Sequence, residues 1–215
     1  MPIVVAGMGT PVELGVVQSL ARPGGNITGL VPAFGRELQI KQLELIREML
    51  PKAKRVAIFD VKEERTQLGE EAMRQTATGM GLTLVFVDAQ LPRIEAGFAQ
   101  LERERVDALS ISGSAPPFMH RNRIVDFARK TQLPDFHTYH QAVDAGALAS
   151  HGHDPYDIFR RAAGYVDRIL KSAKPAEMPV EQIERYTLVL NLKTAKALGL
   201  TIPLAVRIRA ERVIE

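Results

Sequence analysis

The chain has 215 residues, of which 46% are hydrophobic and 25% are charged, with 28 basic residues against 25 acidic ones. These proportions exclude disordered and collagen-like chains, and no apolar run reaches the ~20 residues of a membrane-spanning helix. The lack of cysteine excludes disulfides, thiolate catalysis and cysteine-based metal sites. Basic and acidic residues are interleaved, whereas a nucleic-acid face needs clustered basic residues, so we expect no nucleic-acid partner.

Short apolar runs alternate along the chain with longer segments of helical period. Most of the runs are continuous, which is typical of strands covered on both faces in a parallel sheet. The first run follows Met1 directly, so we expect no signal peptide in the chain as given. The predicted strands are Ile3–Ala6, Arg55–Phe59, Leu82–Val87, Ala108–Ile111, Leu133–Phe136, Ala147–Ser150 and Tyr186–Leu190.

Amphipathic helices are predicted between these strands, because apolar residues recur there at spacings of three or four. Pro11 suits the first turn of a helix and Thr10 suits its N-cap. Asn191 and Gly199 mark the beginning and the end of a short final helix. The other predicted helical segments are 40–50, 68–80, 124–128 and 159–170.

The order of these elements predicts an α/β fold. Strands and helices alternate between Lys54 and Phe136, as in a doubly wound unit with right-handed crossovers. Three partly extended segments, 24–35, 143–153 and 178–190, connect that unit to flanking pieces. We therefore predict two α/β lobes joined by three crossings. In this division residues 31–150 form lobe two, and residues 1–30 and 151–215 form a partial lobe one.

Polar residues follow the predicted strands at their carboxyl ends, where ligands bind in such folds. We predict that Thr10, at a helix start, binds an anionic group and that Asp60 pairs with an ammonium group. Ser112, Ser114, Tyr139 (within the polar cluster 137–140) and His151 are predicted to line the same cleft. These side chains indicate a hydrogen-bonding pocket rather than a reactive centre.

Catalysis is not favoured, because the chain has no nucleophile elbow, phosphate-binding loop or zinc-protease motif. We predict no catalytic residue, no cofactor and no metal. Three alternatives stay open: a metal-dependent hydrolase using His151, His153 and Asp154, a nucleotide-using enzyme, and a cytoplasmic small-molecule sensor domain.

Two long stretches carry a family resemblance. The segment 19–30, SLARPGGNITGL, resembles a signature of the ABC transporter substrate-binding proteins of the ABC_sub_bind (TrpX-like) family, and the tail agrees with that family at 163–171, 173–176, 179–182 and 191–203. The resemblance implies a type I periplasmic-binding-protein fold, ABC permease subunits as partners, and a location in the periplasm or on a lipid anchor outside the inner membrane.

The resemblance also implies that the front of lobe one is missing, because further strands normally precede Ile3–Ala6 in this family. A sheet edge left open in this way predicts a dimer or a domain-swapped oligomer. The pocket positions depart from the family pattern at Thr10, Asp60, Ser112–Ser114 and His151, so tryptophan is not carried over as the ligand. We predict a solute receptor of a bacterial ABC importer that binds a small polar solute, such as an amino acid or a carboxylate, by hinge closure.

Overall fold

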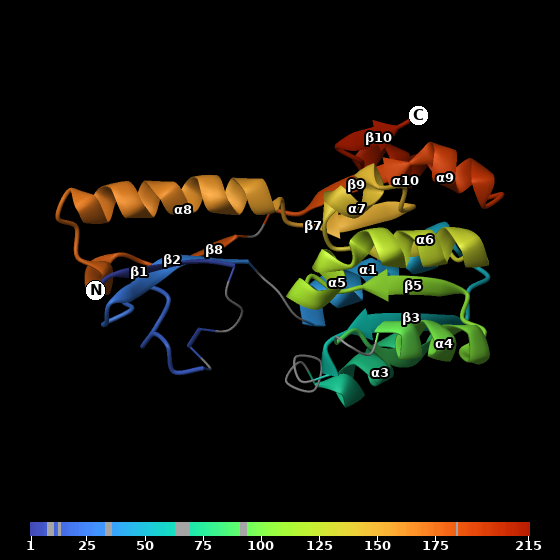
Figure 1. Cartoon of the computed structure of the whole chain (residues 1–215), viewed down its shortest axis with the longest axis horizontal. Helices are drawn as coiled ribbons and strands as arrows, with labels where there is room; N and C mark the ends of the chain where they lie inside the picture. The colour runs from blue at the N-terminus through green and yellow to red at the C-terminus, as the bar shows by residue number, and fades with distance from the viewer. Residues whose placement is uncertain (8–10, 13, 33–35, 63–68, 91–93, 184) are drawn as a thin grey trace. The chain divides into compact units, whose positions relative to one another are not determined.

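The computed structural model describes the chain except residues 8–10, 13, 33–35, 63–68, 91–93 and 184 (Figure 1). The chain divides into two compact units. Unit 1 comprises Met1–Gly35 and His153–Tyr186, and unit 2 comprises Arg36–Gly152 and Thr187–Glu215. The chain thus passes between the units three times, and each passage lies inside or at the end of one of the three predicted connecting segments.

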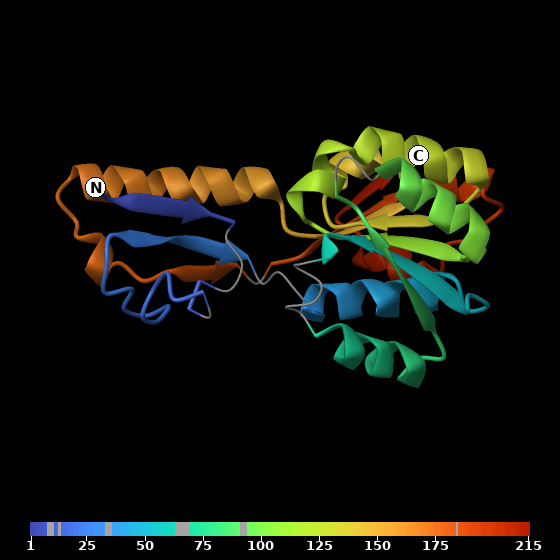
Figure 2. The same ribbon diagram turned by 60° about the horizontal axis from the view of Figure 1, so that its bottom comes forward.

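Unit 1 is a parallel three-stranded sheet with one long helix. The strand order is β1-β2-β8, with β1 at Ile3–Ala6, β2 at Ile27–Pro32 and β8 at Glu181–Ile183. Helix α8, Pro155–Leu170, lies along β1 and β2 (Figures 1 and 2). It begins at Pro155, and the Asp154 carboxylate caps it by accepting a hydrogen bond from Tyr156 N at 2.9 Å. A short 3-10 helix, Pro175–Glu177, leads into β8.

Unit 2 is a seven-stranded sheet in the order β10-β9-β7-β6-β5-β3-β4, in which only the pair β7–β9 is antiparallel. Its central strands are continuous apolar runs because helices cover both faces. The strands are β3 Arg55–Asp60, β4 Thr83–Asp88, β5 Ala108–Ile111, β6 Asp135–His137, β7 Ala149–Gly152, β9 Thr187–Asn191 and β10 Arg212–Ile214.

Two groups of helices flank this sheet, and their buried residues form three apolar clusters. One core contains residues of α1 Arg36–Met49, α3 Glu70–Gly79, α9 Leu192–Ala197 and α10 Leu204–Arg209. The other two clusters contain residues of α4 Ile94–Glu104, α6 Arg121–Thr131 and α7 His140–Asp144. The five-residue helix α5, Ala115–Met119, follows β5 and precedes α6.

The α/β class and all seven predicted strands are confirmed, with ends shifted by at most two residues. The predicted cap of helix α9, Leu192–Ala197, is also confirmed, because Thr194 N donates to Asn191 Oδ1 at 3.1 Å. Gly199 ends that segment with φ 67°, a backbone conformation that favours glycine. The prediction that this helix is the final one is wrong, because α10 follows it.

The helix predicted from Pro11 is wrong over the residues that the structure describes there. Residues 11–12, 14–18 and 20–21 form turns and bends, and the predicted cap Thr10 lies outside the described residues. Gly15, with φ 67°, stops any continuous turn of helix after Pro11.

The division into units differs from the predicted domain boundaries at residues 187–215. That segment was assigned to lobe one, but it belongs to unit 2. The reason is strand pairing: β9 lies between β7 and β10, and Leu188, Val189 and Leu190 are buried in the unit 2 sheet. Because β9 pairs antiparallel with β7, the C-terminal segment belongs to unit 2, although helix α8, which precedes it in the chain, belongs to unit 1.

Candidate ligand-binding site

A buried carboxylate organises the carboxyl end of the unit 2 sheet. Asp60 ends β3 and its side chain is 1% exposed. Its Oδ1 atom accepts hydrogen bonds from Ser112 Oγ at 2.5 Å, Ser114 Oγ at 2.8 Å and Val61 N at 2.7 Å, and its Oδ2 atom accepts one from Gln39 Nε2 at 3.1 Å. Bonds to a charged acceptor are stronger than neutral ones, so Asp60 fixes the turn after β5 against the end of β3.

A second buried network joins α1 to three neighbouring strand ends. Gln42 is fully buried; its Oε1 atom accepts from Ser110 Oγ at 2.7 Å, and its Nε2 atom donates to Thr138 Oγ1 and to His151 O, both at 3.3 Å. Thr138 Oγ1 in turn donates to Ile111 O at 3.3 Å. Because one side chain contacts β5, the end of β6 and β7, it sets the relative heights of these strand ends.

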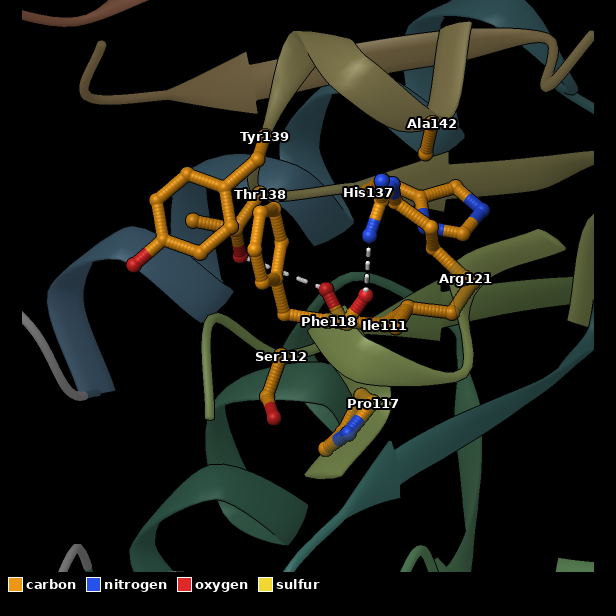
Figure 3. A pocket seen from close by; sticks show the side chains of 9 residues that line it. All are labelled: Ile111, Ser112, Pro117, Phe118, Arg121, His137, Thr138, Tyr139 and Ala142. Carbon is orange, nitrogen blue, oxygen red and sulfur yellow. Dashed lines mark hydrogen bonds between the residues drawn. The ribbon is translucent and has the colours of Figure 1, made fainter. Parts of the chain in front are cut away.

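Beside these networks lies a pocket formed entirely by unit 2 (Figure 3). It encloses about 200 Å³ with its open mouth included, below the ~300–1,000 Å³ of complete small-molecule sites, so it has the size of a subsite. Its walls come from the ends of β5 and β6 and from α5, α6 and α7. The lining residues are Ile111, Ser112, Pro117, Phe118, Arg121, His137, Thr138, Tyr139 and Ala142.

An aromatic pair and a cation give this pocket its chemistry. The rings of Phe118 and Tyr139 meet edge to face, with centroids 5.2 Å apart and planes at 80° (Figure 3). The guanidinium carbon of Arg121 lies 4.8 Å from the centroid of the Phe118 ring, and its Nη1 atom donates to Phe118 O at 3.0 Å. No carboxylate among the described residues pairs with Arg121, so its other N–H groups are available to an anionic ligand group.

A buried pair on β6 includes one residue that lines the pocket, His137. His137 Nε2 lies 3.0 Å from Asp135 Oδ2, and Asp135 Oδ1 accepts from Leu148 N at 2.8 Å. Both side chains are buried. The Asp135 carboxylate therefore sets the orientation of the imidazole that faces the pocket.

The structure brings most of the predicted site residues to one edge of unit 2. Ser112 and Tyr139 line the pocket, and Asp60 and Ser114 belong to the adjoining network. His151 contacts the second network through its backbone carbonyl oxygen, which accepts a hydrogen bond from Gln42 Nε2. Thr10 lies outside the described residues, so its predicted contact with an anion stays a prediction.

Sequence reasoning missed Phe118 and Arg121. They follow β5 closely, on the short helix α5 and at the start of α6. The signal that could have found them is position: the Pro-Pro-Phe segment 116–118 begins a few residues after the end of β5, which places an aromatic ring near the same sheet edge as Ser112.

The residues that the structure describes contain no group of three or more histidine, aspartate or glutamate side chains that could hold a metal ion. His153, one residue of the metal alternative, stacks on Tyr186 with ring centroids 4.7 Å apart, and its Nδ1 atom lies 2.9 Å from Arg185 O. Within the same described residues, no helix is long and apolar enough to cross a membrane.

The model of a family described as ABC transporter substrate binding protein matches residues 1–214. A curated relative, the tyrosine-binding protein of Clostridioides difficile (strain R20291), is 23% identical over 202 residues, which cover 93% of this chain and 57% of the relative. The chain thus spans less than two thirds of the length of that relative.

Two solved structures are similar over nearly the whole chain. An ABC domain in complex with L-Trp from Streptococcus pneumoniae is 27% identical, with a TM-score of 0.85 over 99% of this chain and 73% of that one. A conserved domain protein from Vibrio cholerae O1 biovar eltor is 28% identical, with a TM-score of 0.87 over 99% of this chain and 71% of that one. These matches confirm the predicted type I periplasmic-binding-protein fold.

Proposed function

The chain belongs to the ABC transporter substrate-binding protein family, and on this premise we propose that it is the solute-receptor subunit of an ABC importer. It binds its solute without chemical change, in the periplasm or on a lipid anchor outside the inner membrane, and passes it to the permease subunits. The family match supports this role because it extends over both units.

The proposed solute is an aromatic amino acid. The observation that carries this choice is the pocket itself, in which the Phe118–Tyr139 pair offers aromatic surface next to the guanidinium of Arg121, which pairs with no carboxylate among the described residues. The names of the two relatives, one tyrosine-binding and one in complex with L-Trp, agree with it. The sequence alone predicted a small polar solute such as an amino acid or a carboxylate, and the present proposal is more specific, because it names aromatic amino acids.

Each polar group then has a proposed task. Arg121 pairs with the ligand carboxylate, because guanidinium and carboxylate match in geometry as well as in charge. Ser112 and Thr138 line the pocket with hydroxyl groups. Asp60 orients Ser112 and pairs with the ligand ammonium group through its Oδ2 atom, which among the described residues accepts one hydrogen bond, from Gln39, and so keeps capacity for another.

We propose hinge closure as the mechanism of binding. The three passages of the chain between the units supply the hinge, and a ligand shifts the population toward a closed arrangement only by the difference in its affinity for the two states. Small-angle X-ray scattering tests this: the radius of gyration decreases when a saturating aromatic amino acid is added, and an unchanged curve at saturation contradicts closure.

Isothermal titration calorimetry tests the site. We expect L-tyrosine, L-tryptophan or L-phenylalanine to release heat, and L-lysine and malate to give none. Arg121→Gln weakens binding about tenfold to a hundredfold, since a hydrogen bond to a charged group contributes about 1.5–3 kcal/mol. Phe118→Ala weakens it by a similar factor through lost ring contact.

The matched control is Arg129→Gln. Arg129 lies on the same helix α6, pairs with Asp126 on the surface at 2.7 Å and is not among the pocket residues, so binding stays unchanged in this variant. If Arg121→Gln and Arg129→Gln bind the amino acid equally well, the proposed carboxylate contact is wrong.

A further inference from the structure

Strand β4 is the outermost strand on one side of the unit 2 sheet. It pairs with β3, and no strand among the described residues pairs with its other edge. Its residues 84–87 form an apolar run without proline or glycine. Such a run at a sheet edge is a template for pairing with a strand of another chain, which leads to aggregation. The way in which this edge is covered therefore matters for the behaviour of the whole protein.

The backbone of β4 shows which of its groups lie at the outer edge. Thr83 N donates to Lys54 O, next to β3, at 2.7 Å, so Thr83 directs its backbone groups inward. The backbone groups of successive residues in a strand point to opposite sides. The carbonyl oxygens of Leu84 and Phe86 therefore point away from β3, at the edge where a further strand would pair.

Both of these carbonyl oxygens accept a hydrogen bond from a long side chain. Arg74 Nη1 donates to Leu84 O at 2.9 Å, and Gln100 Nε2 donates to Phe86 O at 3.1 Å. A strand of another chain would have to place its own N–H groups where these side chains lie. The edge is thus closed by side chains of its own unit, which we call the edge caps.

The edge caps come from the two opposite faces of the sheet. Arg74 lies on α3, a helix that shares an apolar cluster with Leu84. Gln100 lies on α4, a helix that shares a different cluster with Val85 and Val87 on the other face. A strand that approached from either face of the sheet would therefore meet one of the two caps.

The Arg74 cap is held in place by two contacts besides its bond to the strand. Its Nη2 atom pairs at 3.0 Å with Glu70 Oε1, one helical turn earlier. Its guanidinium carbon lies 4.5 Å from the centroid of the Phe86 ring, within the range of a cation–π contact. Because three groups hold one guanidinium, the cap does not depend on a single hydrogen bond.

We propose that Arg74 and Gln100 keep the unit 2 sheet from pairing with strands of other chains, above all with β4 of a second copy. The excluded partner is any extended apolar segment whose N–H groups would bond to Leu84 O and Phe86 O. Without the caps a second copy fits best, since an antiparallel pair of β4 strands around a two-fold axis satisfies both chains at once. The proposal is independent of the ligand proposed above.

Sedimentation velocity of the full chain tests the proposal on the double variant Arg74→Leu, Gln100→Leu. We expect this variant to form larger species than the parent, and to do so at a protein concentration about tenfold or more below that at which the parent forms them. The reason is that hydrogen bonds between chains replace the two that are lost within the chain. Each single variant should lie between the parent and the double variant.

The matched control is the double variant Gln75→Leu, Arg103→Leu. It removes one glutamine and one arginine from the same two helices and adds the same two leucines, at exposed positions. Gln75 bonds Glu71 on its own helix, and among the described residues neither control side chain bonds the backbone of β4. Net charge and added apolar surface are therefore equal in the two double variants, and the control should sediment like the parent.

Hydrogen exchange followed by mass spectrometry locates the contact. The amides of residues 83–88 should exchange more slowly in the associated double variant than in its monomer, because outward N–H groups gain partners. Circular dichroism shows whether the variants are folded, and Gln100→Leu alone, which leaves all contacts of Arg74 in place, carries the test if the double variant is not. A double variant that sediments like the parent would overturn the proposal. So would a control that associates equally, or association without slower exchange in β4.

Discussion

Replacing Asp60 tests whether its carboxylate fixes the sheet end, because this group accepts four hydrogen bonds while 1% exposed. In Asp60→Ala the two serine hydroxyls can still bond each other, since Ser112 Oγ lies 3.0 Å from Ser114 Oγ. Val61 N and Gln39 Nε2 lose their acceptor. Each buried unsatisfied donor costs about 1–3 kcal/mol, so we expect a loss of about 2–6 kcal/mol in the free energy of unfolding.

The near-isosteric variant Asp60→Asn separates charge from shape. Its amide oxygen still accepts from the two serines, and its amide nitrogen needs an acceptor where Gln39 now donates. Gln39 Oε1 has no hydrogen-bond partner among the described residues, so rotation of the Gln39 amide supplies one. The remaining cost is the change from charged to neutral bonds, about 1–2 kcal/mol.

Urea unfolding followed by far-UV circular dichroism measures both variants, with the transition of unit 2 fitted separately if two transitions appear. Asp126→Ala on the surface of α6 is the control and costs at most about 0.5 kcal/mol. The reasoning fails if Asp60→Ala costs no more than the control, or if Asp60→Asn costs as much as Asp60→Ala. Calorimetry on Asp60→Asn, the less destabilised of the two variants, then tests the proposed ammonium contact.

Three further predictions concern the folded state. Burial, and after it the hydrogen bond to Glu181, raises the pKa of Tyr165 to about 12. The folded chain therefore keeps this proton after the unfolded chain loses it near pH 10, so the free energy of unfolding falls between pH 10 and about 12. Tyr165→Phe removes this fall, and an identical fall in the variant would refute its assignment to Tyr165. Gly29→Ala destabilises unit 1 by about 3 kcal/mol, because at φ 134° the added Cβ atom would lie 2.1 Å from Val5 O. Gly25→Ala is the control, since its Cβ atom would meet nothing within 4 Å. Equal melting temperatures of the two variants would contradict this prediction. Gln42→Met costs about 1–3 kcal/mol in urea unfolding, since Ser110 loses its acceptor, and a cost near zero would show that the network contributes nothing.

The strands that sequence reasoning found and missed differ in their physical signal. The run Arg55–Phe59 is recognisable because four consecutive apolar residues are buried on two faces. Strand β2 is not, because Gly29 and Pro32 interrupt its pattern. Strand β2 nevertheless requires glycine at position 29, because its backbone approaches that of β1 closely at Val5. The same glycine interrupts the apolar pattern by which a strand is recognised in the sequence. Strands β8 and β10 have three residues each, too few for a period.

The candidate site was predictable where strand ends gather and not where short helices contribute. Asp60, Ser112 and Tyr139 follow from the rule that parallel strands end at one edge of the sheet. Phe118 lies on a helix of five residues, in which no amphipathic period can be read. Gln42 looks like a polar residue on a helix surface until the packing of α1 buries it.

The three passages between the units have a consequence for synthesis. Neither unit is a continuous stretch: unit 1 joins residues 1–35 to 153–186, and unit 2 takes in β9, which is made after all of α8. At about 5–20 residues per second, β1 and β2 emerge from the ribosome on the order of ten seconds before the helix that covers them. Over that interval the apolar face of β1 and β2 that α8 later covers stays exposed, and we expect chaperones that bind nascent chains to act on this segment.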